Sequence, residues 1–248
     1  MHLTSSHRHG PWLPGVLALL IGAAGHAGAQ VQPRAPERHN PLRATYARAH
    51  FYQAMLLHDA VARGDLDAAR LEATHLSQSA TAIVMPAGAA AFQAALTHLA
   101  QRASTAATLH EAAQTSAAIL GTCGQCHQAM HTRAILPAGD AITTGGLAGH
   151  MQLHQHGSDA LIEGLVAPSD AAWAEGVRTF AAPSLAEHEA PGDLRKEMSA
   201  GEAKLSQLAG EAAQARRSRD RETAYGRILA TCGECHRTVS RHARPGRR

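Results

Sequence analysis

All four cysteines of this 248-residue chain belong to two motifs of the form C-x-x-C-H. The motifs are Cys123-Gly124-Gln125-Cys126-His127 and Cys232-Gly233-Glu234-Cys235-His236. On a helix, residues i, i+3 and i+4 share one face, so both thiols can bond to one porphyrin while the histidine ligates its iron. This spacing is the attachment signature of a c-type haem. We therefore expect two covalently bound c-type haems.

Other uses of the cysteines fit the spacing less well. A zinc ribbon pairs two C-x-x-C knuckles about 15–20 residues apart, whereas Cys126 and Cys232 lie 106 positions apart. A thioredoxin-type pair needs a surrounding βαβ pattern, and the sequence offers none. Two structural disulfides are an alternative in an exported chain, but they leave His127 and His236 unexplained.

The N-terminus predicts export. Arg8 precedes an apolar run from Trp12 to about Ala24, and Ala27-Gly28-Ala29 offers a small-residue cleavage site. This is the layout of a secretory signal peptide, here residues 1–29. The apolar run is well short of the roughly 20 residues of a membrane span. We expect cleavage after Ala29, a periplasmic location, and no stable membrane span in the mature protein.

The charge balance gives no reason to expect nucleic-acid binding. Without the signal peptide the chain keeps 22 basic and 20 acidic side chains, far from a basic footprint. Arginines do gather late in the chain, at Arg216, Arg217, Arg219, Arg221, Arg237, Arg241, Arg244, Arg247 and Arg248. Such a segment is either a solvated tail or a docking patch for an acidic redox protein, whose encounter it would accelerate.

The chain repeats itself. Residues 119–127 match residues 228–236 at an offset of 109, with seven of nine positions identical. Further upstream, residues 59–64 resemble residues 159–164 at an offset of 100. We expect two homologous units, 40–136 and 149–243, each ending in its C-x-x-C-H motif. Their boundary should fall in the Gly/Pro/Thr-rich stretch from Pro137 to Gly149.

Both units have helical periodicity, and no alternating run predicts a strand. In the first unit, Asn40 and Pro41 predict a helix start and Gly64 its end. Three more helices should follow, from about Leu66, around Leu96, and from about Thr105 to His127. In the second unit Ser169 should cap the second helix. The sequence thus predicts an all-α protein made of two tandem four-helix bundles, with each motif near the end of a last helix.

This arrangement resembles the class II c-type cytochromes, the cytochrome c′-like four-helix bundles, in tandem. The resemblance rests on the late C-x-x-C-H motif in each half and covers nearly all of the mature chain. It implies a haem held between helices, with His127 and His236 as proximal ligands and the first helix of each unit across the opposite face. Known members include six-coordinate electron carriers and gas-binding proteins with an open sixth position.

The sixth ligand decides between these functions, because the axial ligands set the reduction potential and the access of small molecules. His50 is the candidate in the first unit, and His150 and His154 are the candidates in the second. The two offsets leave open which of these pairs with His50, and we favour His154 because it lies closer to the middle of its helix. Packing at the core boundary is the favoured role of the two methionines in these helices, Met55 and Met151. Surface positions are expected for His58, His75, His98, His110 and His131.

The sequence therefore predicts a periplasmic dihaem electron carrier with imidazole on both sides of each iron, and not an enzyme. Redox proteins, acidic ones among them, are the expected partners. The alternative is a haem-based gas-binding or peroxidase-like protein with one open iron. The coordination of the two irons separates these functions.

Overall fold

The computed structural model describes residues 41–79, 87–136, 145–182, 192 and 194–242, and the side chains from Arg48 onwards. The predicted signal peptide 1–29, most of the expected boundary and the last three arginines lie outside these residues. Within them every regular element is a helix, which confirms the all-α prediction. The elements are α1 (Pro41–Ala62), α2 (Leu66–Ser79), η1 (Ala87–Ala89), α3 (Ala90–Ser104), α4 (Leu109–Ala129), α5 (Gly146–Val166), α6 (Asp170–Ala181), α7 (Arg195–Ala212) and α8 (Ser218–His242).

Local signals set several helix ends. Gly64 has a φ of +77°, and the amide that it carries bonds to the carbonyl of Val61 at 2.9 Å, as in a left-handed C-terminal cap. The Ser169 side chain accepts the amide of Ala172, so the predicted cap of α6 is confirmed. In α4 the cap is Thr108, and the helix therefore starts a turn later than the expected Thr105.

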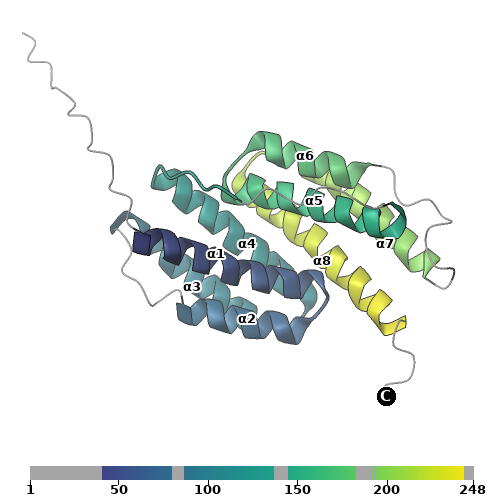
Figure 1. The fold of residues 1–248 in the computed structure, drawn as a ribbon, viewed down its shortest axis with the longest axis horizontal. Coiled ribbons are helices and arrows are strands. Elements are labelled where there is room, and N and C mark those ends of the chain that lie inside the picture. Colours follow the sequence, from purple (N-terminus) through teal and green to yellow (C-terminus); the bar gives the residue numbers. More distant parts are fainter. Residues whose placement is uncertain (1–40, 80–86, 137–144, 183–191, 193, 243–248) are drawn as a thin grey trace, which may run out of the picture. The chain divides into compact units, whose positions relative to one another are not determined.

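Helices that follow each other in the chain pack together within each half (Figure 1). In the first half α1 packs on α2, α2 on α3 and α3 on α4, and α1 also contacts α4. The second half repeats this with α5 to α8. The short loops Arg63–Asp65 and Ala167–Ser169 make the first two helices of each half antiparallel neighbours.

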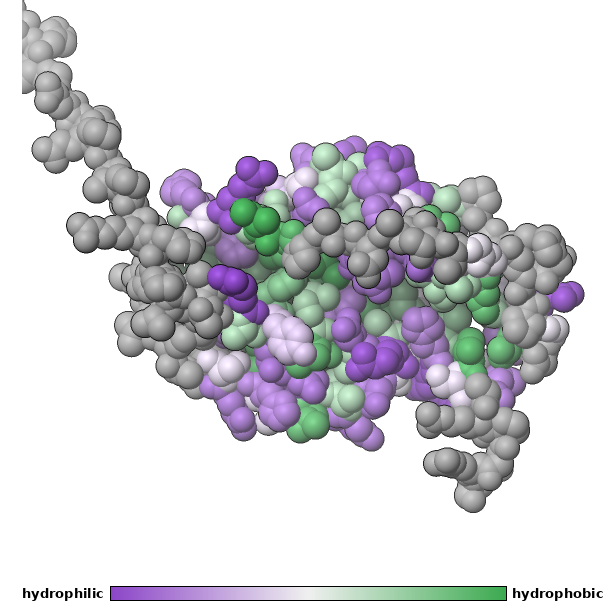
Figure 2. Space-filling model, in the orientation of Figure 1, coloured by the Kyte–Doolittle hydropathy of each residue, from purple (hydrophilic) through white to green (hydrophobic). Residues whose placement is uncertain are grey.

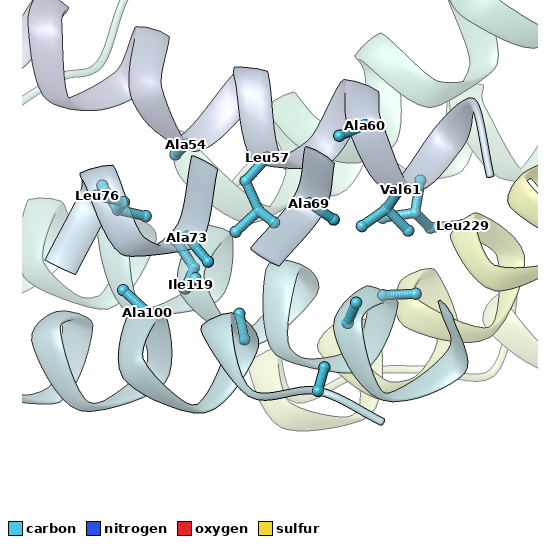
Figure 3. Packing of buried hydrophobic residues seen from close by; sticks show 14 of the residues in the cluster. Ala54, Leu57, Ala60, Val61, Ala69, Ala73, Leu76, Ala100, Ile119 and Leu229 are labelled. Atoms are coloured by element: carbon cyan, nitrogen blue, oxygen red, sulfur yellow. The ribbon is translucent and has the colours of Figure 1, made fainter. Parts of the chain in front are cut away.

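The two halves also pack against each other. The pair α4 and α8 has one of the most extensive helix contacts of the described chain. The core around α1 to α4 includes Leu229 of α8, which lies beside Val61 of α1 (Figure 3). The core around α5 to α8 includes Leu120 of α4. Residues 40–248 accordingly form one compact unit, and the division into folding units 40–136 and 149–243 stays a prediction.

Buried positions reveal the register of the duplication. In the first two helices of each half the offset is 104, because Ala69, Ala73 and Leu76 of α2 lie at the buried positions that Trp173, Val177 and Phe180 occupy in α6. In the last two helices the offset is 109, as for Leu96 and Leu205. The structure therefore relates α1 to α5 at 104 and not at the offset of 100 that residues 59–64 and 159–164 suggested.

Hydrophilic residues (purple) and hydrophobic residues (green) are mixed over the part of the face that Figure 2 colours. Within the described ranges, the exposed large hydrophobic residues lie apart from one another in the sequence, at Tyr52, Leu71, Ile135 and Leu153. Among the described helices, none is both long and apolar enough to cross a membrane.

Candidate functional site

The two C-x-x-C-H motifs lie at equivalent places, towards the C-terminal ends of α4 and α8. All four cysteines are free thiols, so the disulfide alternative finds no counterpart in the structure. Cys123 packs against both cores, and Cys232 packs against the second. Burial raises the pKa of Cys123 and of Cys232 to about 12, so the inner thiol of each motif is protonated near neutral pH.

Each motif histidine uses the same ring nitrogen for a hydrogen bond to a backbone carbonyl. His127 Nδ1 lies 2.8 Å from the carbonyl oxygen of Val166, and His236 Nδ1 lies 2.6 Å from that of Ala62. A carbonyl only accepts, so Nδ1 carries the proton and donates in both bonds. The neutral tautomer then has its lone pair on Nε2, the atom that can bind a metal.

His50 lies on α1, one turn before the buried Ala54. Its side chain is half-buried, and this burial lowers the pKa of His50 below its usual value. A histidine that stays neutral is the form that ligates metals. At the offset of 104, the counterpart of His50 on α5 is His154 and not His150, which agrees with the pairing that we favoured from the sequence.

His150 and His154 meet a carboxylate of α7. His150 Nε2 lies 2.9 Å from Glu202 Oε1, and His154 Nε2 lies 3.4 Å from the same atom. The three ligand atoms all lie within 4.8 Å of one another, a donor set that transition metals accept. Burial alone would raise the pKa of Glu202, but the hydrogen bonds from His154 and His150 outweigh it and lower that pKa.

Glu202 was not expected from the sequence. The sequence did contain a sign of it, because Glu202 shares one helical face with Met198, Leu205 and Ala209, and these three apolar residues are buried. A carboxylate on an apolar stripe needs a partner in the core. Glu202 also lies near the second motif. Its neighbour Gly201 faces Cys235. Burial is the main cause of the raised pKa of both Cys232 and Cys235, and the negative charge of Glu202 adds to it.

The expectation of a surface position is wrong for His58. Only 3% of this residue is exposed. Its Nε2 lies 2.6 Å from the hydroxyl of Tyr225, which is itself 2.7 Å from the hydroxyl of Ser158. A polar side chain of α8 thus links α1 to α5. The expectation holds for the other four, His75, His98, His110 and His131, which are exposed.

The late arginines that the structure describes, residues 216–241, differ in their surroundings. Arg221 is buried: its guanidinium lies over the ring of Trp173, 5.3 Å from the centroid, and bonds to Asp170. Arg217 pairs with Asp220. Arg237 and Arg241, by contrast, are exposed on α8 just after the second motif. Among the described late arginines, Arg237 and Arg241 are thus the exposed ones that follow a motif directly.

Two cavities adjoin the candidate ligands. One of about 360 Å³ opens beside His127, between the end of α4 and the loop that joins α5 to α6. The other, of about 260 Å³, is lined by His150, His154 and Glu202 together with Phe180 of α6. The first motif, through His127, and both candidate histidines of α5 thus border space that a ligand can enter.

Comparison of the chain with protein-family models, with curated proteins and with solved structures found no significant match. The site is therefore interpreted from its own residues.

Proposed function

We propose that this protein is an exported, periplasmic dihaem c-type cytochrome that transfers electrons between redox partners and is not an enzyme. The observation that carries the proposal is the pair of C-x-x-C-H motifs at equivalent positions of α4 and α8, with all four thiols free. The two sets of consecutive helices support tandem bundles of the class II cytochrome type, with one haem each.

The donor atoms fit covalent haem. Each motif offers two thiols and one histidine on a single helical face, and metal-ligating histidines commonly donate their other ring N–H to a carbonyl or carboxylate. His127 and His236 both have that partner on Nδ1. Bound haem would supply a one-electron couple whose potential depends on the axial ligands and on burial. The role of the helices is to hold the ligands rigidly and to keep water from the iron.

We propose His50 and His154 as the sixth ligands, opposite His127 and His236. The register of 104 between α1 and α5 supports this pair, and so does the burial that keeps His50 neutral. His150 is the alternative to His154. With His154 bound to iron, His150 retains Glu202 as its hydrogen-bond partner. Arg237 and Arg241 are the proposed contacts for an acidic redox protein, and their effect on its encounter rate should weaken with salt.

Intact mass tests the haem assignment. The protein made together with a haem-attachment system should exceed the mass of the chain beginning at Gln30 by two haems. Replacing either Cys126 or Cys235 with alanine should disturb one attachment and leave the other. A protein at bare polypeptide mass would refute the proposed function.

Electron paramagnetic resonance of single variants tests the sixth ligands. His50→Ala and His154→Ala should each turn one of the two haems high-spin and open it to carbon monoxide, whereas His150→Ala should not. The opposite result for the last two variants would make His150 the ligand. Binding of carbon monoxide at both irons of the unaltered protein would favour the gas-binding function. A stoichiometric non-haem metal that Glu202→Gln removes would assign the trio to that metal instead.

A further inference from the structure

Each motif histidine contacts the half of the chain to which it does not belong. His127, of the first half, donates to Val166 at the end of α5, and His236, of the second half, donates to Ala62 at the end of α1. We infer that each half of the protein orients the proximal ligand of the haem attached to the other half. The presence of haem in this inference rests on the proposed function. The contact of each motif histidine with the other half rests on the two hydrogen bonds.

Two glycines make these contacts possible. A Cβ atom on Gly124 would overlap the carbonyl oxygen of Leu165, and one on Gly233 would overlap that of Val61. The C-x-x-C-H signature leaves the residue after the first cysteine open, yet both motifs of this chain have glycine there. Glycine is needed there because α5 comes too close to Gly124, and α1 too close to Gly233, for a side chain to fit.

The contact occurs twice in the same register. Val61 and Ala62 are related to Leu165 and Val166 by the offset of 104 that relates α1 to α5. Gly124 and His127 are related to Gly233 and His236 by the offset of 109 that relates α4 to α8. The two halves differ in sequence, yet each provides the same kind of carbonyl acceptor for the motif histidine of the other half.

The chemistry of a helix end explains what the contact does. The last carbonyls of a helix have no amide partner within it, and they carry the negative end of the helix dipole. Ala62 and Val166 are the last residues of α1 and α5. Hydrogen bonding of Nδ1–H to such an acceptor fixes the ring orientation and makes Nε2 a stronger donor to a metal. A stronger donor favours ferric iron, so each first helix should lower the potential of the haem on the other half.

Variants in the motifs test the contact directly. Gly124→Ala should push the end of α5 away from His127 and raise the midpoint potential of one haem, and Gly233→Ala should do the same to the other haem. The matched control is Gly210→Ala, also in a helix, where an added Cβ has no neighbour within 4 Å. Two-component redox titration measures both potentials in the full-length holoprotein.

Variants across the interface test the exchange. Gly64→Ala changes only the first half, where the added Cβ would meet the Gly233 carbonyl and Arg237 at a φ of +77°, and it should shift the haem on His236. Pro168→Gly changes only the second half, where Pro168 lies against Gly124, and it should shift the haem on His127. Single-haem forms that lack the cysteines of the other motif identify which potential moves.

Hydrogen exchange gives a readout that needs no redox activity. Amides in the last turn of α5 should exchange faster in Gly124→Ala, those in the last turn of α1 faster in Gly233→Ala, and neither in Gly210→Ala. If two haems are present and Gly124→Ala and Gly233→Ala shift neither potential, the inference is wrong and the proposed function stands. The same holds if Gly64→Ala and Pro168→Gly shift both potentials equally, or shift the haem attached to their own half. A chain without haem refutes the proposed function, and the redox effect inferred here falls with it.

Discussion

Tyr225 connects three helices through its hydroxyl group, which lies within hydrogen-bond distance of His58 on α1 and of Ser158 on α5. We expect Tyr225→Phe to lower the free energy of unfolding by about 1–3 kcal/mol, because it leaves Nε2 of the buried His58 without its hydrogen-bond partner. Urea denaturation followed by circular dichroism measures this change.

A double-mutant cycle provides the control for Tyr225. His58→Leu removes the other buried polar group, so the variant that combines it with Tyr225→Phe should lose less stability than the two single variants together. Strict additivity of the two losses would show that the side chains do not interact in solution.

The motif thiols should differ in reactivity in the haem-free, full-length protein. Burial raises the pKa of Cys123 and Cys232 to about 12, from an ordinary value of 9.0, which lowers the thiolate fraction near neutral pH roughly a thousandfold. Iodoacetamide should therefore modify Cys126 and Cys235 first, as peptide mass spectrometry can show. Denaturant should abolish the difference, and equal rates without denaturant would contradict the burial.

At the scale of single residues the two C-x-x-C-H motifs were recognisable because their residues have a fixed spacing along one helix, and their role in haem attachment stays a prediction. It failed at His58 and Glu202, whose partners come from distant helices. His58 lies 167 positions from Tyr225, and His150 lies 52 positions from Glu202. No local pattern specifies such pairs, although a polar residue on an apolar stripe marks the need for one.

The crossing of α4 and α8 depends on Gly226. A Cβ atom there would come within 2.9 Å of Gln114 Cα, a backbone atom that cannot rotate away. We expect Gly226→Ala to cost about 1–3 kcal/mol of stability through overpacking. Gly210→Ala, at an open helical position of α7, should instead gain about 0.5–1 kcal/mol. Thermal unfolding of the two variants compares them, and a gain from both would place α8 farther from α4.

Helices themselves were predictable because their signals are local. Ser169 caps α6 as expected, and the inward faces of α2 and α6 follow from spacing alone. The offset between the first helices of the two halves was not predictable from sequence identity, since the similarity of residues 59–64 to 159–164 suggested an offset of 100. Buried positions give 104, because packing conserves the side that faces the core and tolerates exchange of the residues themselves.

The two halves share their cores, and this has a consequence for the molecule as a whole. Leu229 of α8 belongs to the first core and Leu120 of α4 to the second. A helix that completes both cores cannot leave one without opening the other. A destabilising substitution in the first half should therefore also destabilise the second half, although the sequence predicted two separate units, 40–136 and 149–243.

Leu57→Ala tests this coupling, since Leu57 is fully buried in the first core and its truncation should cost about 2–5 kcal/mol. Trp173 lies in the second core, and with Trp12→Phe it is the single tryptophan of the chain. In urea, its fluorescence and the far-ultraviolet circular dichroism should both shift to the same lower midpoint, because one cooperative transition involves all helices. Val61→Ala provides a second, milder variant in the same core. A Trp173 transition that keeps its midpoint while the helical signal splits into two steps would show that 40–136 and 149–243 unfold independently.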